Sequence, residues 1–247
     1  MSHAYRTFFG LTREPFSSEL RIDEILQTEA VLAVAERIAY ATRLGAMALI
    51  TGEVGSGKST ALRFATHCLH PSEYRLLWIT AVGGSILELY RQLACELETE
   101  SFSYSRAALT RLIRRALTDL VMAKKLKVLL VIDEASLLRL EVLAELHTLS
   151  QFEGDSKPIL PIILAGQNNL VDKLYWKTSL PLASRIVTRS HLEGVKREDM
   201  EAYLNHHLRI LYECGTNPSL SGARPDFFKI SPEYLSWTRK PLPFAAF

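Results

Sequence analysis

The chain alternates between two kinds of hydrophobic pattern. Amphipathic stretches, with apolar residues three and four positions apart, are separated by short and nearly continuous apolar runs. The first pattern is typical of helices that pack on one face, and the second of strands buried in a parallel sheet. The patterns predict helices over residues 29–43, 59–70, 85–98, 106–127, 140–153 and 197–213, and strands over residues 46–51, 74–81, 128–134, 159–167 and 184–192. This alternation predicts an α/β fold in which helices flank a parallel five-stranded sheet.

The composition is that of an ordinary globular protein. Of the 247 residues, 48% are hydrophobic and 23% are charged, which is enough for one large α/β core with a small appendage. The formal net charge of +2 does not by itself indicate a nucleic-acid partner. Cys68, Cys95 and Cys214 form no CxxC pair, which favours a reducing cytoplasm. The chain shows no secretory signal and no apolar run of roughly 18 to 20 residues, so we expect a soluble, cytoplasmic protein without a membrane span.

Residues 51–60, TGEVGSGKST, lie between a predicted strand and a predicted helix. Within them, the pattern GxxxxGK[ST] is satisfied by Gly52, Gly57, Lys58 and Ser59. In this pattern backbone N–H groups surround the phosphates of a nucleotide, the lysine places a positive charge at the outer phosphates, and the serine hydroxyl binds Mg²⁺. The N-terminus of the following helix adds its partial positive charge. A glycine-rich turn can match this pattern by chance, but the strand before it and the helix after it are the context that phosphate binding requires.

An acidic pair ends the most strand-like run, VLLVIDE at residues 128–134. Asp133 at the strand end is suited to hold Mg²⁺ together with Ser59, and Glu134 is suited to polarise an attacking water. An acidic strand end or helix cap is the alternative, but the phosphate loop earlier in the chain favours catalysis. The predicted nucleotide-binding residues are Gly52, Glu53, Val54, Gly55, Ser56, Gly57, Lys58, Ser59, Thr60 and Asp133.

Several stretches together resemble a known family. They are FFGLTREPF, LITGEVGSGKSTALR, VLLVIDEASLL, IILAGQNNL and REDMEAYLNHHLR. They are similar to AAA+ ATPases of the ExeA type, the general secretion pathway protein A group. Closely similar ATPases also accompany DNA transposases, comparable in role to the transposition helpers MuB, IstB and TniB. The resemblance implies a P-loop NTPase fold of the AAA+ type that binds ATP and Mg²⁺ and associates with itself.

The resemblance also implies two further catalytic residues. Gln167 falls where the family places the polar residue of its first sensor, which contacts the γ-phosphate or the attacking water, and Asn168 is its rival for this role. Arg185 falls where the family carries an arginine directed at the nucleotide of a neighbouring subunit, with Arg189 as the second candidate. From the residues alone, Gln167 would be a surface amide and Arg185 a member of a surface ion pair.

The predicted domain organisation has three parts: an aromatic N-terminal arm over residues 1–27, an AAA+ core over residues 28–194, and a partial helical lid over residues 195–247. In the arm, Phe8, Phe9 and Phe16 are expected to pack against the ATPase core.

The C-terminal end departs from the family pattern. The family continues its lid with a G-x-P-R motif whose arginine is a second sensor, whereas this chain ends in TRKPLPFAAF. Arg239 lacks that motif and is not assigned the role. Pro241 and Pro243 disfavour a further helix. We therefore expect an incomplete lid, from a chain end that is truncated or read in another frame.

The predicted helix over residues 106–127 is strongly basic, with seven basic residues and one acidic residue. Arg111, Arg114 and Arg115 share one face by helical spacing, and the opposite apolar face holds Leu109, Leu112, Ala116 and Leu120. Such a helix is either a core helix with a solvated outer face or a surface that contacts DNA phosphates without reading sequence.

These observations predict an ATP-dependent switch that assembles with itself and acts on a partner. A soluble helper of transposition, with DNA and a transposase as partners, is placed slightly ahead of a secretion or envelope-assembly ATPase. A small-molecule kinase would use the same loop, but the adjacent Asp133 and Glu134 with a downstream arginine argue against it. A nucleotide binder with little turnover is a further alternative because of the atypical chain end.

Overall fold

The computed structural model describes residue 13 and residues 16–17, 19–99, 105–152 and 159–213. Contacts group the chain into two compact units, one of residues 27–194 and one that joins residues 1–26 to residues 195–247. The predictions made for Phe8, Phe9, Arg239, Pro241 and Pro243 fall outside the described residues. No helix in the described part of the chain combines the length and the apolar character needed to cross a membrane.

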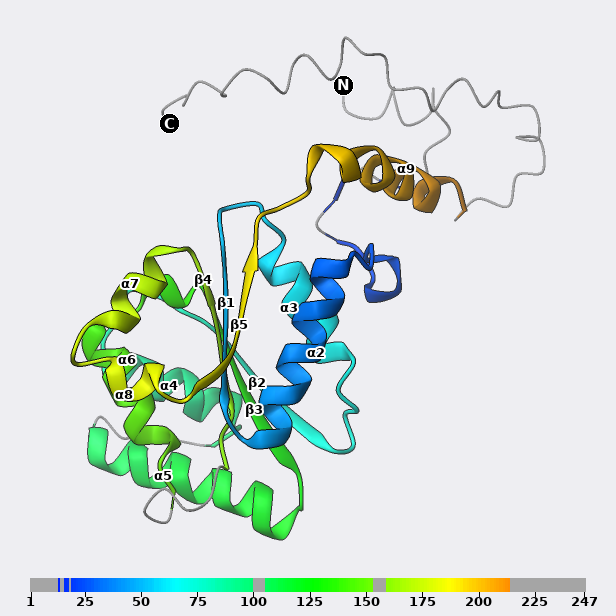
Figure 1. The fold of residues 1–247 in the computed structure, drawn as a ribbon. Helices are drawn as coiled ribbons and strands as arrows, with labels where there is room; N and C mark the ends of the chain where they lie inside the picture. The colour runs from blue at the N-terminus through cyan, green and yellow to red at the C-terminus, as the bar shows by residue number, and fades with distance from the viewer. Residues whose placement is uncertain (1–12, 14–15, 18, 100–104, 153–158, 214–247) are drawn as a thin grey trace, which may run out of the picture. The chain divides into compact units, whose positions relative to one another are not determined.

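The larger unit is built on a parallel five-stranded sheet, as the sequence predicted (Figure 1). The strands are β1 (Met47–Gly52), β2 (Tyr74–Thr80), β3 (Lys127–Asp133), β4 (Ile162–Gly166) and β5 (Ile186–Leu192), in the spatial order β2-β3-β4-β1-β5. Because all neighbouring strands are parallel, their carboxyl ends meet at one edge of the sheet. The segments after β1, β3 and β4, which carry the predicted phosphate loop, acidic pair and sensor, therefore leave the sheet side by side.

Helices cover both faces of this sheet (Figure 1). They are α2 (Glu29–Leu44), α3 (Lys58–His67), α4 (Ile86–Glu96), α5 (Arg106–Thr118), α6 (Leu140–Ser150), α7 (Asn169–Tyr175) and α8 (Leu180–Ala183). In β3, Leu129 and Val131 pack in the cluster that includes residues of α2 and α3, whereas Leu130 and Ile132 pack in the cluster that includes residues of α4, α5 and α6. All four side chains are fully buried, which explains why this strand reads as one continuous apolar run.

Several boundaries differ from the sequence prediction for local reasons. The helix expected over residues 106–127 ends at Thr118 and is followed by a single π-helical segment, η2 (Asp119–Ala123). Lys125, with a φ of 55°, then redirects the backbone toward β3. The strand expected from residue 159 begins only at Ile162, because the preceding Pro161 has no N–H to donate to a strand ladder.

The buried stripe of α5 is centred one position away from the predicted one. Leu109, Ile113 and Leu117 are fully buried, whereas Leu112 and Ala116 are half-buried at its margin. Leu120, the last residue of the predicted stripe, is also half-buried. The four-residue spacing of the buried positions keeps them on one line along the helix.

Because of this shift, the prediction that three arginines lie opposite the apolar stripe is wrong for Arg114 and holds for Arg111 and Arg115. With 100° per residue, Arg111 and Arg115 lie about 160° from the centre of the buried stripe and are exposed, but Arg114 lies only about 100° away. Arg114 reaches across to the neighbouring helix, where its Nη2 donates to the carbonyl oxygen of Thr148 at 2.8 Å. Its guanidinium lies over the ring of Phe152, 5.5 Å from the centroid. Arg114 is therefore half-buried and engaged in contacts with Thr148 and Phe152 of its own chain.

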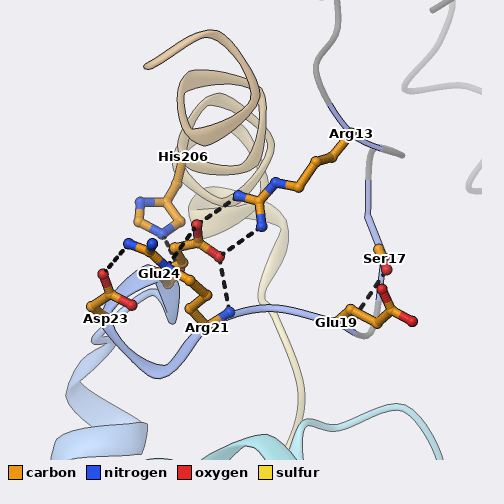
Figure 2. A network of polar contacts seen from close by, with 7 residues as sticks. All are labelled: Arg13, Ser17, Glu19, Arg21, Asp23, Glu24 and His206. Carbon is orange, nitrogen blue, oxygen red and sulfur yellow. Dashed lines mark hydrogen bonds and ion pairs between the residues drawn. The ribbon is translucent and has the colours of Figure 1, made fainter. Parts of the chain in front are cut away.

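The smaller unit contains the described part of the N-terminal arm, with η1 (Ile22–Glu24), and α9 (Arg197–Glu213). Figure 2 shows a polar network around the buried carboxylate of Glu24. Its Oε1 accepts from Arg13 Nη2 at 2.6 Å, its Oε2 accepts from the backbone N–H of Arg21 at 2.8 Å, and its carbonyl oxygen accepts from His206 Nε2 at 2.8 Å. The hydrogen bond from Arg13 lowers the pKa of Glu24 below its ordinary value. These contacts tie the arm to α9.

An aromatic cluster lies on the same helix. The ring of Phe16 is 5.4 Å from the ring of His207, which in turn lies 4.4 Å from the ring of Tyr203. Burial, and to a lesser extent the neighbouring His206, lowers the pKa of His207. From the sequence we expected Phe16 to pack against the ATPase core. In the structure its ring contacts the ring of His207 on α9.

Candidate functional site

The predicted phosphate loop joins β1 to α3, as its motif requires. Gly52 ends the strand, and a Cβ atom there would lie 2.4 Å from the carbonyl oxygen of Leu192 and 2.5 Å from Ser56 Oγ. Gly57 has a φ of 88° and is the N-cap of α3, a conformation that side chains rarely adopt. The two motif glycines are thus needed for close packing at one end of the loop and for backbone conformation at the other.

Lys58 is the first residue of α3 and is only 6% exposed. Its Nζ donates to the carbonyl oxygens of Gly52 at 2.9 Å and Glu53 at 2.8 Å, so the ammonium group lies against the loop. The hydroxyl of Ser56 is buried within the same loop and has no hydrogen-bond partner among the described residues. A buried cation and an unsatisfied hydroxyl in one glycine-containing loop fit the binding of a phosphate group.

Ser59 and Asp133 are brought together by the parallel sheet. Ser59 Oγ donates to Asp133 Oδ2 at 2.8 Å, and the aspartate is 7% exposed at the end of β3. A hydroxyl and a carboxylate are ligands that Mg²⁺ accepts when nucleotide phosphates complete its coordination. Within the described ranges, no group of three or more His, Cys, Asp or Glu side chains could hold a metal ion by itself. The donor set therefore fits Mg²⁺ that is shared with a nucleotide.

Glu134 follows directly and has an unusual backbone conformation. Its φ of 53° and ψ of 32° lie in the left-handed region, which costs a residue other than glycine about 1–3 kcal/mol. Its N–H donates to Asp133 Oδ1 at 2.9 Å, and its carbonyl accepts from the N–H of Leu137 at 2.9 Å. The short helix η3 (Ala135–Leu137) begins at this point. Strain of this kind is concentrated at functional sites, where the surrounding structure maintains it.

The two candidates for the first sensor lie beside the loop. β4 ends at Gly166, which is paired with Thr51, so Gln167 and Asn168 emerge next to the phosphate loop. Asn168 Nδ2 donates to Glu53 Oε1 at 2.6 Å, which links this segment to the loop itself. The carbonyl of Gln167 accepts from the N–H of Leu170 at the start of α7.

Arg185 is not brought to the phosphate loop of its own chain. Its carbonyl oxygen accepts from the N–H of Met47, at the end of β1 opposite Gly52. Its Nε donates to His147 Nδ1 of α6 at 2.9 Å. Arg189, its alternative, is exposed and pairs with Leu49 in the middle of β1.

Two contacts at the site involve residues that the sequence analysis did not single out. Thr51 Oγ1 lies 3.1 Å from His191 Nδ1 on the edge strand β5. Lys173 Nζ of α7 donates to the carbonyl oxygens of Ser136 at 2.6 Å and Leu138 at 2.8 Å. Neither His191 nor Lys173 belongs to a motif. Both contacts join segments far apart in the chain, so no local sequence signal predicts them.

Comparison with known proteins identifies the family. A family model described as an AAA domain matches residues 42–174, a range that includes the phosphate loop and the segment after β3. The chain belongs to the AAA domain family. This assignment confirms the predicted AAA+ type and the predicted ATPase class, and the fold of the family implies a nucleotide-binding site.

A curated relative supports the predicted resemblance as well. The chain is 32% identical over 211 residues to General secretion pathway protein A of Aeromonas hydrophila. The match covers 83% of this chain but only 38% of that protein, so this chain corresponds to a minor part of the relative.

Solved AAA+ structures share the fold at low identity. Cdc6p from Pyrobaculum aerophilum superposes with a TM-score of 0.59 and 16% identity, over 83% of this chain and 53% of that one. The ADP form of the Aeropyrum pernix ORC2 protein gives a TM-score of 0.58 and 18% identity, over 87% of this chain and 59% of that one. Both likenesses concern the fold, and this chain spans less than two thirds of either protein.

Proposed function

We propose that this chain binds ATP with Mg²⁺, hydrolyses the ATP, and uses its nucleotide state to switch an interaction with a partner. The observation that carries the proposal is the hydrogen bond from Ser59 Oγ to Asp133 Oδ2 at 2.8 Å, which joins the start of α3 to the acidic end of β3. P-loop nucleotide hydrolases hold their metal ion with a serine or threonine hydroxyl and an aspartate in this relation. The ATPase core is residues 28–194, flanked by the arm over residues 1–27 and the partial lid over residues 195–247.

Each group at the site has a distinct role in this proposal. The loop backbone and the ammonium of Lys58 bind the phosphates, while Ser59 and Asp133 hold Mg²⁺. Mg²⁺, when bound, neutralises negative charge on the phosphate oxygens. Glu134 orients the attacking water and accepts its proton. Gln167 contacts the γ-phosphate or the water from the end of β4.

Self-association is part of the proposal, because AAA+ homologues typically oligomerise. Exposed apolar side chains cluster in sequence just before β5: Tyr175 is 65% exposed, Trp176 is 61% exposed and Leu180 is 48% exposed. Aromatic residues of this kind often anchor protein interfaces. Arg185 follows the same segment, and in this proposal the neighbour that binds this surface does so with its phosphate loop toward the arginine.

For the partner, the comparison favours a protein of a secretion or envelope-assembly machinery. General secretion pathway protein A is a curated relative, and its identity of 32% extends over most of this chain. A helper role in DNA transposition is the second candidate. It is supported by the exposed Arg111 and Arg115 on α5, together with the exposed Lys124 and Lys125 after it.

The test of the ATPase proposal compares two substitutions. Lys58→Ala removes the cation at the phosphates, and we expect ATP affinity to fall by about tenfold to a hundredfold, the usual loss for hydrogen bonds to a charged group. Glu134→Gln preserves size but removes the base, and we expect ATP binding to persist while turnover falls by about 10²- to 10⁴-fold. Nucleotide titration and phosphate release measure the two effects.

Glu141→Gln on the exposed first turn of α6 is the matched control and should change neither quantity. Full turnover by the Glu134→Gln protein would remove Glu134 from catalysis. ATP binding without phosphate release in the unmodified protein would establish the alternative of a nucleotide binder with little turnover.

A further inference from the structure

Lys173 bonds to the backbone of the turn that carries Glu134. It lies on α7, 37 positions from Ser136, and its half-buried ammonium donates to the carbonyl oxygens of Ser136 and Leu138 at 2.6 and 2.8 Å. These carbonyls belong to η3 and to the residue that caps it. A cation that binds two carbonyl oxygens of the same turn holds a short helix more firmly than one neutral hydrogen bond does.

A second contact also constrains η3. A Cβ atom on Gly166 would lie 2.8 Å from the backbone nitrogen of Ser136, so the turn rests directly on the backbone at the end of β4. The N–H of Leu137 donates to the carbonyl of Glu134, which closes the turn onto the glutamate. The segment is therefore held by contacts with the end of β4 and with the side chain of Lys173.

Glu134 needs this confinement because its own conformation is unfavourable. A non-glycine residue in the left-handed region relaxes unless neighbouring structure determines its backbone. On its N-terminal side the restraint is the hydrogen bond from its N–H to Asp133, and on its C-terminal side it is the turn held by Lys173. The conformation that directs the Glu134 carboxylate thus depends on a residue from a different element.

We infer that Lys173 is a positioning residue for Glu134. In this role it acts through the backbone carbonyls of Ser136 and Leu138, by keeping η3 in place so that the carboxylate retains its position relative to Asp133 and the phosphate loop. This inference rests on the proposed ATPase function. Its chemistry predicts a specific defect, in which turnover is lost while nucleotide binding is retained.

The experiment compares Lys173→Met with Lys173→Arg in the full chain. Methionine keeps the length of the side chain without its charge or donors, and we expect kcat to fall by about tenfold to a hundredfold, the effect of a small misplacement of a catalytic group. The affinity for ATP should not change. Arginine keeps the charge and the donors, and should recover most of the lost turnover. Lys127→Met, at an exposed position where β3 begins, at the other end of the strand from Asp133, is the control and should leave kcat unchanged.

A readout without nucleotide separates this inference from the ATPase proposal. Amide hydrogen exchange over residues 134–138 should be faster in the Lys173→Met protein than in the Lys127→Met protein. In a Glu134→Gln background, adding Lys173→Met should cause no further loss of turnover, because the residue acts through Glu134.

Turnover by the original chain combined with an unchanged kcat in Lys173→Met would overturn only this inference. A complete lack of turnover in the original chain would overturn the ATPase proposal and this inference together. A lower melting temperature with unchanged kcat would show that Lys173 is merely structural.

Discussion

The backbone N–H of Met47 donates to the carbonyl oxygen of Arg185 at 3.1 Å, so Arg185 lies at the opposite end of β1 from the phosphate loop. Five residue steps of a parallel strand separate Met47 from Gly52, roughly 16 Å, which is further than an arginine side chain extends. The bond from Arg185 Nε to His147 keeps the side chain near α6. Any contribution of Arg185 to hydrolysis must therefore be made at the site of another subunit.

We predict that Arg185→Ala binds ATP normally. Its kcat should be lower by a factor of about 10³ to 10⁵ if the arginine acts as in other nucleotide hydrolases. Mixing this protein with Lys58→Ala should restore part of the activity, because a mixed interface then joins an intact phosphate loop to an intact arginine. Phosphate release measured across mixing ratios, with light scattering to follow assembly, checks this. Arg189→Ala is the matched comparison on β5, and a loss confined to Arg189→Ala would transfer the role to that residue.

A second prediction separates the two candidates for the first sensor. The amide of Asn168 donates to Glu53, and this contact holds the loop irrespective of catalysis. We therefore expect Gln167→Ala to reduce turnover with little change in ATP affinity, and Asn168→Ala to weaken ATP binding more than it slows turnover. Kd and kcat measured on both proteins decide between them. The opposite pattern would assign the sensor to Asn168.

The elements of the core could be predicted from sequence because burial determines them. Residues 128–133 form an apolar run ended by an acid, and a strand covered on both faces requires that composition. The limits of α9 were also predicted in full, since its amphipathic spacing is regular. α8 was not predicted, because four residues with a proline in the first turn show no helical period.

The candidate site was predictable only where a motif carries its own geometry. The phosphate-loop pattern and the acidic strand end predicted that Ser59 and Asp133 would be neighbours, although they are 74 positions apart. The hydrogen-bond partners of Arg114, Lys173 and Arg185 depend on how α6, α7 and η3 pack. No local sequence pattern predicts that packing.

A third prediction concerns DNA, and it follows from the corrected geometry of α5. If the basic surface binds duplex phosphates, changing both Arg111 and Arg115 to glutamate should abolish binding and leave ATP affinity intact. For the unmodified chain, the logarithm of the affinity should fall with the logarithm of salt, by about 0.9 for each phosphate neutralised. Fluorescence anisotropy of a labelled duplex, with ATP, with ADP and without nucleotide, measures both effects.

Arg114→Ala is the control for that experiment. It should lower the stability of the fold, because Arg114 bonds to Thr148 and lies over Phe152, while DNA affinity should change little. Absence of binding at low salt, in protein that binds ATP, would favour a protein partner and hence the secretion-type role.

The last prediction is an acid-sensitive contact between the N-terminal arm and α9. His207 is 4% exposed, and burial lowers its pKa below the ordinary 6.5, so the folded unit favours the neutral ring. When folding lowers the pKa of a group, the group contributes fully to the stability of the fold at a pH above its pKa in the unfolded state. This contribution is lost as the pH falls through its pKa in the folded state. The contact should therefore weaken as the pH drops below about 6.5. Glu24, whose pKa is lowered from 4.5, adds a loss in the same direction only at more acidic pH.

Amide hydrogen exchange over α9, corrected for the intrinsic effect of pH, measures this contact. Acidification from about pH 7.5 to about pH 5.5 should increase exchange in the unmodified chain, because the unfolded segment takes up a proton that the folded one resists. His207→Phe keeps an aromatic ring beside Phe16 and Tyr203 but cannot titrate, so its exchange should respond less to pH. His67→Gln, at an exposed position of α3, should respond like the unmodified chain. Equal pH responses in His207→Phe and His67→Gln would show that His207 does not control the contact.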